Sequence, residues 1–378
     1  MTAIDSLETP AALIELGRMR ANITRMQARM NHLGVTFRPH VKTSKSLPVV
    51  REQLAAGAKG ITVSTLKEAE QFFAAGIDDI LYAVGIVPAK LEKVLDLRRR
   101  GCRLKIITDN AVAAAAIVEC GKKQGEVFDV WIEVDCDGHR SGIKPEEAEK
   151  LVDVSRILVE GGMVLGGVMT HAGSSYELDT PQALEAMAEQ ERAGCVRAAE
   201  HIRRAGIACP GVSVGSTPTA LSAGNLAGVT EMRAGVYVFF DLVMHNVGVC
   251  RTDDIALSVL TTVIGHQVEK GWAIVDAGWM AMSRDRGTSK QKRDFGYGLV
   301  CGLDGSVLPG YVMSGANQEH GIISCENAVD ADIAARFPVG TLLRILPNHA
   351  CATGAQFPVY YVQDADGSID VWERFYGW

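Results

Sequence analysis

Apolar and polar positions alternate in blocks between about residue 10 and residue 245. Each short apolar run is followed by a longer segment rich in Ala, Glu, Lys and Arg, which is typical of a strand followed by a helix. The predicted strands are Val35–Arg38, Gly60–Ser64, Asp79–Val84, Arg103–Thr108, Asp129–Val134, Val164–Thr170, Gly211–Val214 and Met232–Phe239. The predicted helices include Lys67–Ala75, Pro88–Arg100, Ala111–Gln124, Pro145–Glu160 and Pro181–Ala205.

Eight strands alternating with helices predict an α/β fold, namely a (β/α)8 TIM-type barrel. A doubly wound parallel sheet is the alternative. That fold normally carries a Gly-rich fingerprint directly after its first strand, and this sequence has none there.

The pattern changes after about Val247, where strand-like runs are separated by Gly, Pro, Asn and Asp turns. Asp332–Arg336 is expected to form one helical turn, and residues 3–14 could add an N-terminal strand. We predict a barrel domain at residues 13–246, and an all-β second domain from residues 1–12 plus 247–378. The predicted strands of this β domain are Ile255–His266, Trp272–Asp276, Gly298–Leu303, Tyr311–Ser314, Thr341–Leu346, Val359–Val362 and Ile369–Glu373.

Composition narrows the class of protein. The chain has 378 residues, of which 47% are hydrophobic and 22% charged, as in ordinary globular enzymes. Its net charge of −7 argues against a nucleic-acid partner. No apolar run reaches the roughly 18 residues of a membrane span, and the N-terminal residues lack the pattern of a signal peptide. We therefore expect a cytoplasmic protein.

The nine cysteines are scattered and form no Cys-x-x-Cys motif. An odd number without such spacing indicates reduced thiols rather than a disulfide framework. Most are expected to be small buried side chains. Cys351 is the exception, because it follows a histidine at His-x-Cys spacing.

The stretch from Arg38 to Leu47 carries the clearest chemical signal. Lys42 comes directly after the first predicted strand, and Arg38, His40 and Lys45 are close to it in sequence. Neighbouring cations or burial can lower a lysine pKa. Such an amine is a nucleophile suited to Schiff-base formation with an aldehyde. A basic surface loop is the alternative interpretation.

Polar and glycine residues follow six of the eight predicted strands, and in a barrel such positions gather at one end. Gly215-Ser216-Thr217 follow strand seven, and Gly235-Val236 lie within or after strand eight. Several barrels bind a phosphate at the loops after these two strands. Glycine lets the backbone approach the anion, and hydroxyl and free N–H groups donate to it. The sequence thus predicts a phosphate site at these two loops.

The β domain offers a second pair of functional side chains. On an extended strand, residues i and i+2 point to the same side, so His349 and Cys351 could bind one metal ion. Imidazole and thiolate suit Zn²⁺ and related divalent ions. The alternative is a buried histidine and a buried cysteine without a metal. The segment Gln318–Gly321 could supply hydrogen bonds to the ligands.

Five motifs carry a resemblance that spans essentially the whole chain: Pro-His-x-Lys-Thr, His-Ala-Gly, Gly-Ser-Thr-Pro-Thr, Arg-x-Gly-x-Tyr-Val-Phe and Pro-Asn-His-x-Cys. In this order they resemble the fold-type III pyridoxal-phosphate enzymes, in the branch of the D-serine dehydratases and D-threonine aldolases. The resemblance implies an alanine-racemase-like barrel with a β domain, and a homodimer. The aldolases carry His-x-Asp at the last motif, and tend to have a histidine at the position of Ser174, so both differences favour a dehydratase.

The resemblance also implies roles for individual residues. Lys42 would bind pyridoxal 5'-phosphate as a Schiff base, and His349 and Cys351 would bind one divalent metal ion. Arg140 matches a residue near the cofactor phenolate oxygen, and Arg233 an arginine near the pyridine nitrogen in racemases. The full set of implied cofactor-binding residues is His40, Lys42, Arg140, His171, Tyr176, Gly215, Ser216, Thr217, Arg233, Gly235, Val236 and Tyr237.

The resulting hypothesis is a lyase that eliminates water from a D-3-hydroxy amino acid, releasing a 2-oxo acid and ammonia. The freed Lys42 amine would remove the Cα proton as a general base. The cofactor would delocalise the carbanion, and the metal would act as a Lewis acid on the hydroxyl group. If Arg233 contacts the ring nitrogen, the ring is a weaker electron sink and the metal matters more.

Several alternatives remain open. An aldolase would release glycine and an aldehyde instead of ammonia, and a racemase would leave His349 and Cys351 without a role. A non-catalytic pyridoxal-phosphate carrier would resemble the barrel alone, and the β domain with His349 and Cys351 argues against it. A metal-dependent barrel hydrolase is disfavoured, because it would usually take several histidine and carboxylate ligands from the barrel strands and the sequence shows no such set.

The sequence does not decide which substrate the protein prefers or which metal ion it binds. The resemblance favours D-threo-3-hydroxyaspartate over D-serine, and such a dicarboxylic substrate needs a further cation. The metal could be Zn²⁺, Mn²⁺ or Co²⁺. The candidate cations for the second carboxylate are Arg140, Arg233, Arg284, Arg286 and Lys290.

Overall fold

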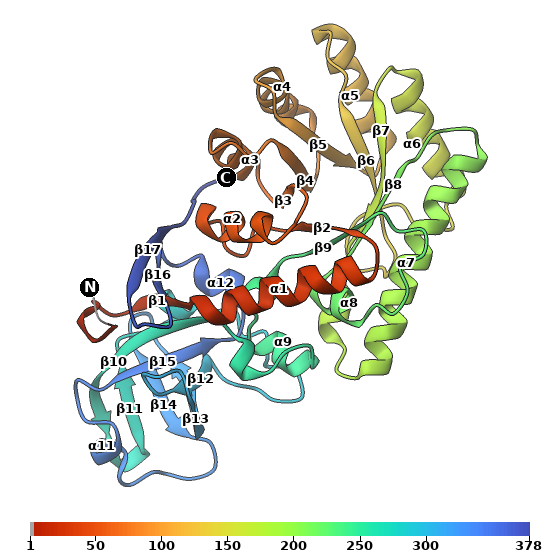
Figure 1. Ribbon diagram of the computed structural model, residues 1–378. Coiled ribbons are helices and arrows are strands. Elements are labelled where there is room, and N and C mark those ends of the chain that lie inside the picture. Colours follow the sequence, from red (N-terminus) through yellow and green to blue (C-terminus); the bar gives the residue numbers. More distant parts are fainter. Residues whose placement is uncertain (1–3) are drawn as a thin grey trace. The chain divides into compact units, whose positions relative to one another are not determined.

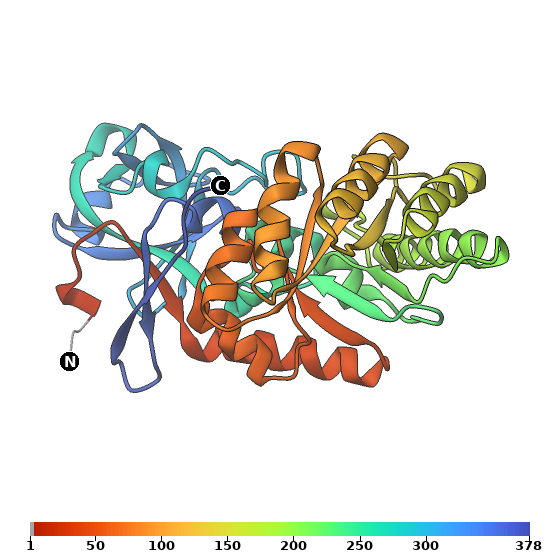
Figure 2. The ribbon, with the colours of Figure 1, turned by 90° about the horizontal axis from the view of Figure 1, so that it is seen from above.

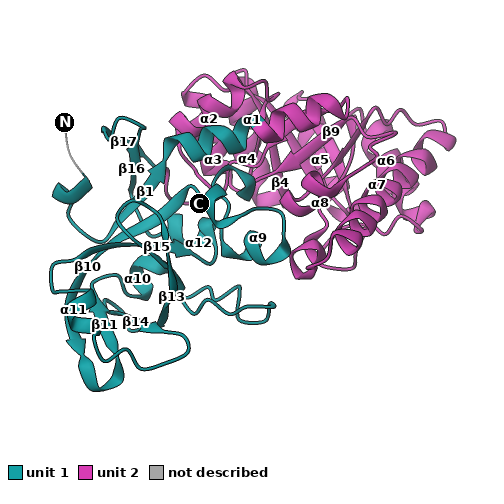
Figure 3. Cartoon of the chain, turned by 60° about the horizontal axis from the view of Figure 1, so that its bottom comes forward, with its two compact units in different colours: residues 1–24, 236–374 teal, residues 25–235, 375–378 magenta. Residues whose placement is uncertain are grey.

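The computed structural model describes residues 4–378 and divides the chain into two compact units, shown in different colours in Figure 3. Unit 1 comprises residues 1–24 and 236–374, and unit 2 comprises residues 25–235 and 375–378. These limits differ from the predicted domain boundaries at 12/13 and 246/247, which stay a prediction. Residues 1–3, with the start of the predicted N-terminal strand and of the segment judged not to be a signal peptide, lie outside the described residues.

Unit 2 is a parallel barrel of eight strands, in the spatial order β2-β9-β8-β7-β6-β5-β4-β3. Its helices lie outside the strands (Figures 1 and 2). The strands are β2 (Thr36–Pro39), β3 (Ile61–Val63), β4 (Asp79–Gly85), β5 (Arg103–Thr108), β6 (Asp129–Val134), β7 (Val164–Thr170), β8 (Gly211–Val214) and β9 (Glu231–Ala234). The helices are α2 (Leu47–Ala55), α3 (Leu66–Ala74), α4 (Leu91–Arg99), α5 (Ala111–Gln124), α6 (Ala148–Glu160), α7 (Pro181–Arg204) and α8 (Thr217–Ser222), and the unit boundary falls within α1 (Leu16–His32).

The barrel strands are short and mostly buried because both of their faces are covered, and β2 and β9 each carry a buried arginine. Leu81, Ile107, Trp131 and Met169, from four adjacent strands, form one buried cluster of the core. Between β2 and β3 the sheet is joined by a single parallel bridge, His40 to Thr62. The barrel therefore closes directly beside Lys42.

Unit 1 is built on a nine-stranded sheet in the order β11-β14-β13-β12-β15-β10-β1-β16-β17, with an additional pairing of β10 and β11 that closes six of these strands into a small barrel. Only the pair β1–β16 is parallel. The strands are β1 (Ala11–Glu15), β10 (Leu257–Gln267), β11 (Trp272–Val275), β12 (Gly298–Cys301), β13 (Val307–Ala316), β14 (Gly321–Cys325), β15 (Leu342–Pro347), β16 (Val359–Gln363) and β17 (Ile369–Glu373). The remaining helices are α9 (Leu242–Val247), α10 (Trp279–Met282), α11 (Ile333–Arg336) and α12 (Ala350–Gly354), and short 3-10 helices occur at Ile4–Ser6, Pro88–Lys90, Gly173–Glu177, Val236–Val238, Thr252–Asp254 and Val268–Lys270.

The predicted barrel and the all-β second domain are confirmed. The set of predicted strands differs from the structure in two main respects. The eighth barrel strand ends at Ala234, because the chain turns into the 3-10 helix Val236–Val238 instead of continuing to Phe239. Strand β14 was absent from the predicted set, although it pairs with both β11 and β13. Within residues 4–378, no helix combines the length and the apolar character needed to cross a membrane.

Candidate active site

The backbone around Lys42 is held by hydrogen bonds on both sides. The Val41 N–H donates to the Thr62 carbonyl at 2.9 Å, and the Lys45 N–H donates to the Val41 carbonyl at 2.8 Å. The Lys45 carbonyl in turn accepts from the Phe375 N–H at 2.7 Å. Lys42 itself is exposed, so a fixed turn presents a side chain that solutes can reach.

Two of the three cations expected to surround Lys42 are engaged elsewhere. Arg38 forms ion pairs with Glu231 at 2.7 Å and Asp79 at 2.8 Å. Lys45 pairs with Glu68 at 3.1 Å. The expectation that sequence neighbours supply the positive charge around Lys42 is therefore wrong for these two residues.

The third sequence neighbour, His40, is joined near Lys42 by His171 from the loop after β7. Burial and the neighbouring cations, Lys42 first among them, lower the pKa of His40 well below its usual value. Burial also lowers the pKa of His171 to about 3, although the contact of its Nδ1 with the Gly215 carbonyl at 3.0 Å opposes the shift. Both imidazoles are thus uncharged at neutral pH. The ring of Tyr176 lies 6.1 Å from that of His171, between ring centroids.

Positive charge at this end of the barrel comes from arginines distant in sequence. Arg233, on β9, is buried, and its Nε donates to the Ser213 hydroxyl at 2.8 Å while its Nη2 donates to the Thr170 carbonyl. Burial lowers the pKa of Arg233, with Glu231 opposing the shift. Arg140, after β6, has a side chain that is 57% exposed and lies 3.6 Å from Glu133.

The loop after β8 requires glycine at its first position. Gly215 has φ of 133°, and a Cβ there would lie 2.1 Å from the Arg233 carbonyl oxygen. Ser216 caps α8: its hydroxyl accepts from the Thr219 N–H at 3.2 Å. Thr217 is the first residue of that helix.

The expectation of free N–H groups in this loop is wrong for two residues. The Gly215 N–H donates to Glu191 Oε1 at 3.1 Å, and the Ser216 N–H donates to Thr219 Oγ1 at 2.9 Å. Gly235 also lies close to the first loop, since a Cβ there would be 3.1 Å from the His40 carbonyl oxygen. Val236 and Tyr237 begin the second segment of unit 1, where both are buried in a 3-10 helix.

These residues fit an anionic cofactor with an aldehyde group. Within the described residues 4–378, neither Lys42 nor Arg233 has a carboxylate within ion-pair distance, so both cations can attract an anion. Gly215 and Gly235 allow close backbone approach, and Lys42 offers an accessible amine. Pyridoxal 5'-phosphate has the matching groups, a phosphate and an aldehyde.

In unit 1, His349 and Cys351 lie in hydrogen-bonding contact with each other. The predicted extended strand is wrong here, because β15 ends at Pro347, His349 is the N-cap of α12 and Cys351 is within that helix. The buried Asp241 carboxylate accepts the Ala350 N–H at 2.9 Å and so fixes the start of the helix. The pair is thus brought together by a helix N-terminus instead of a strand.

The donor set at this pair fits a divalent ion. His349 Nδ1 lies 2.6 Å from Asp285 Oδ2, which leaves Nε2 as the nitrogen for a metal. Burial opposes a positive charge on His349, but Cys351 and Asp285 together raise its pKa well above the usual value. Two donors that share a proton are also placed to share a metal ion. Within residues 4–378 no group of three or more His, Cys, Asp or Glu side chains is arranged for a metal.

Two acidic residues of these sites were not predicted. Asp285, in the loop after α10, hydrogen-bonds His349, the role expected of the Gln318–Gly321 segment. Glu191, on α7, accepts from the Gly215 loop. Asp285 gives no local sequence signal because it is 64 positions away from His349 in the chain. Glu191 gives none because a glutamate is an ordinary polar residue of a helix.

The remaining candidate cations for a substrate carboxylate are all exposed residues of unit 1. Arg286 pairs with Asp294 at 2.7 Å, and the Arg284 guanidinium lies 5.0 Å from the Trp279 ring centroid. Lys290 lies in the same exposed segment. The structure favours none of the three.

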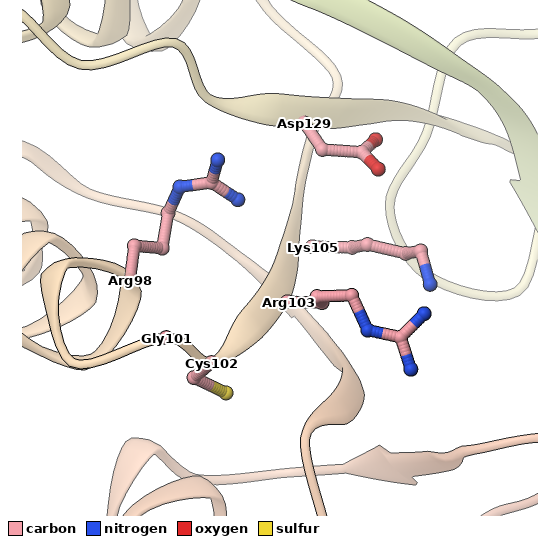
Figure 4. A pocket seen from close by; sticks show the side chains of 6 residues that line it. All are labelled: Arg98, Gly101, Cys102, Arg103, Lys105 and Asp129. Atoms are coloured by element: carbon pink, nitrogen blue, oxygen red, sulfur yellow. The ribbon is translucent and has the colours of Figure 1, made fainter.

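A cavity of about 440 Å³ lies at the amino-terminal ends of β5 and β6 (Figure 4), at the opposite end of the barrel strands from Lys42. Active sites of such barrels lie at the carboxyl-terminal ends of the strands. This cavity therefore does not belong to the candidate site. It is lined by Arg98, Gly101, Cys102, Arg103, Lys105 and Asp129.

Comparison with known proteins agrees with the fold and the motifs. The family described as alanine racemase, N-terminal domain, matches residues 14–243, and a putative serine dehydratase domain matches residues 256–363. The chain belongs to the alanine racemase N-terminal domain family. The resemblance inferred from its five motifs is thereby confirmed.

Within this family the similarity to characterised proteins covers the whole chain. D-threo-3-hydroxyaspartate dehydratase from Delftia sp. (strain HT23) is 68% identical over 374 residues, which cover 99% of this chain and 98% of the relative. D-serine dehydratase from Dictyostelium discoideum is 31% identical, with coverages of 97% and 96%. A solved structure of a cysteine-to-alanine mutant of D-threo-3-hydroxyaspartate dehydratase, in the metal-free form, is 66% identical, covers 100% of both chains and has a TM-score of 0.99.

Proposed function

We propose that this chain is a lyase that depends on pyridoxal 5'-phosphate and a divalent metal ion and dehydrates D-threo-3-hydroxyaspartate to oxaloacetate and ammonia. The single observation that carries the proposal is the 68% identity, over nearly the full length of both chains, to an enzyme with that name. Lys42, Arg233 and His171 at one end of the barrel give the chemistry a physical basis.

Bound at Lys42, the cofactor would supply an electron sink for the charge left when the Cα–H bond breaks. Once the substrate amine has taken its place on the cofactor, the freed Lys42 amine, on its hydrogen-bonded turn, would take up the Cα proton as general base. His40 and His171, uncharged at neutral pH, would be poor acceptors for this proton because their pKa values are lowered. Arg233, held by Ser213 and Thr170, would supply fixed positive charge toward the anionic cofactor.

His349 and Cys351 would hold the metal, with Asp285 orienting the imidazole. Hydroxide is a poor leaving group, and a divalent ion would supply Lewis acidity toward it. A relative described as a cysteine-to-alanine mutant in the metal-free form supports a metal ion in that enzyme. Zn²⁺, Mn²⁺ and Co²⁺ are the proposed ions, and a cytoplasmic homodimer is the proposed state of the protein.

The deciding experiment measures ammonia released from D-threo-3-hydroxyaspartate, D-serine and D-threonine, with and without a chelator. We expect ammonia from the first substrate, its loss on chelation, and its return on adding one of the three ions. Cys351→Ala should lose the metal response, whereas Cys325→Ala, a half-buried cysteine of the same unit, should keep it. Ammonia release that is indifferent to chelation would overturn the metal's role.

D-serine dehydratase activity is the second candidate, because the 31% identical relative carries that name. A higher rate with D-serine than with D-threo-3-hydroxyaspartate would favour it. Glycine from D-threonine without ammonia would indicate an aldolase. Bound cofactor without turnover of any of the three would indicate a carrier.

A further inference from the structure

Glu191 is a buried carboxylic acid that the proposed reaction does not use. It lies on α7 with only 1% of its surface exposed. Glutamate is almost never fully buried unless its oxygens are satisfied by partners. Among residues 4–378 no cation lies within ion-pair distance of it, although Arg233 acts on it from a longer distance and lowers its pKa. Its direct partners are neutral donors.

Those donors come from two different loops at the candidate site. Glu191 Oε1 accepts the Ala172 N–H at 2.9 Å and the Gly215 N–H at 3.1 Å. Ala172 directly follows His171, and Gly215 directly precedes Ser216. A single oxygen atom of Glu191 therefore joins the loop after β7 to the loop after β8.

The hydroxyl of Thr219 adds a third contact, in the first turn of α8. Burial raises the pKa of Glu191, and this hydrogen bond opposes the shift. Both backbone donors reach the same oxygen, so they are accepted whether or not the other oxygen carries a proton. What the loops require from this side chain is reach and an acceptor, instead of a negative charge.

The two loops also touch elsewhere. His171 Nδ1 lies 3.0 Å from the Gly215 carbonyl, and the hydroxyls of Ser175 and Ser216 lie 2.8 Å apart. These contacts involve side chains within the loops themselves. Glu191 differs because it lies on a 24-residue helix outside the loops. Its hydrogen bonds therefore fix both loops to the helical outer layer of the barrel.

We propose that Glu191 is a positioning residue, which sets the separation of the His171 loop and the Gly215–Thr217 loop before the cofactor binds. The inference rests on the proposed function, since it assigns these two loops to pyridoxal phosphate. A preformed site loses less conformational entropy when it binds its ligand. Glu191 would thus raise the affinity for the cofactor without touching it.

The test compares two substitutions that separate reach from charge. Glu191→Gln keeps the length and an acceptor oxygen but loses the charge. Glu191→Asp keeps the charge but is one CH₂ shorter, so it cannot reach both N–H groups. Leu184→Ala is the matched control, because Leu184 is buried two turns earlier on the same helix and is not part of the candidate site.

Three quantities are measured for each protein: the unfolding midpoint, the affinity of the cofactor-free protein for pyridoxal 5'-phosphate, and hydrogen exchange of peptides covering residues 171–175 and 213–218 without cofactor. We expect E191D to lose affinity about ten-fold and to exchange faster in both peptides, because buried N–H groups lose their acceptor. E191Q should stay within about two-fold of the parent protein. L184A should lower the midpoint while leaving affinity and the exchange of both peptides unchanged.

An affinity lower in E191Q than in E191D would overturn the proposal, since charge would then matter more than reach. Unchanged affinity and exchange in E191D, with only a lower midpoint, would reduce Glu191 to a structural role and also overturn it. If the parent protein does not bind pyridoxal phosphate at all, the proposed function fails. Hydrogen exchange of the two peptides would still test whether Glu191 holds the loops.

Discussion

At the amino-terminal end of the barrel strands, Arg38 lies between Glu231 and Asp79, and Lys105 forms a further ion pair with Asp79. At the carboxyl-terminal end, Lys42 and Arg233 form no ion pair within residues 4–378, and both nearby histidines are uncharged. The side chains at one end of the barrel thus form close ion pairs, whereas Lys42 and Arg233 at the other end have no carboxylate of the described chain within ion-pair distance. Unpaired cations are costly in a protein interior, unless a ligand with negative charge completes the site.

This comparison separates the residues that hold the barrel from those that would do chemistry. Substitutions at the amino-terminal end should change stability and spare the reaction. Substitutions at the carboxyl-terminal end should change cofactor binding or turnover.

The largest effect is expected from Lys42→Ala. Turnover should fall by about 10²–10⁴-fold or more, because the proposed general base and cofactor attachment are lost together. The absorbance of the bound cofactor should change as well. Lys105→Ala, a lysine at the opposite end, should keep both properties, and full turnover in K42A would refute the assignment of Lys42.

Arg38→Ala should destabilise the protein by about 3–5 kcal/mol, because it leaves the buried Glu231 without its ion-pair partner and removes one of the two cations that pair with the half-buried Asp79. Urea unfolding measures this change. Arg103→Ala is the control, because its pair with Asp78 at 3.0 Å is exposed and should contribute only about 0–1 kcal/mol. Equal losses of unfolding free energy in R38A and R103A would contradict a larger contribution from the ion pairs of Arg38.

The pH dependence of stability should report on His171. In the unfolded chain this imidazole takes up a proton near pH 6.5, whereas in the folded protein its pKa is about 3. Stability is therefore fully present above about pH 6.5 and is lost as the pH falls, by on the order of 1–2 kcal/mol at pH 5.

His171→Asn should remove that share of the loss when unfolding of the cofactor-free protein is followed from pH 7 to pH 5. His32→Asn, at an exposed position, should not. If the pH dependence of the unfolding free energy is unchanged in H171N, the imidazole of His171 is charged in the folded state. The carboxyl-terminal end of the barrel would then contain a further cation.

The smallest effect is expected from Asp129→Asn in the amino-terminal cavity of Figure 4. Burial raises the pKa of this carboxyl group, so removing its charge should cost little. Turnover and cofactor affinity should not change. A marked loss of turnover or of cofactor affinity would show that this cavity affects the candidate site. The amino-terminal end of the barrel would then not be purely structural.

Local hydrophobic patterns correctly predicted the limits of those strands whose position depends mainly on burial. Strands β5, β6, β7 and β8 have the predicted limits, because continuous apolar runs bounded by turns fit a sheet covered on both faces. Strand β14 was overlooked because a five-residue run gives a weak signal, and its place is decided by pairing with β11, far away in sequence. The His349–Cys351 segment became a helix because Asp241 accepts the Ala350 N–H from 109 positions earlier.

The sequence by itself determined the fold class, the order of its elements and the residue types that carry the chemistry, because hydrophobic periodicity and short motifs are local properties. Only the tertiary structure decided which charges meet. It turned Arg38 and Lys45 toward carboxylates, and it brought Arg233 and His171 to the end of the barrel where Lys42 lies. It also brought Glu191 to two loops and Asp285 to His349. Charge interactions depend on distance in space and on burial, and neither can be read from separation along the chain.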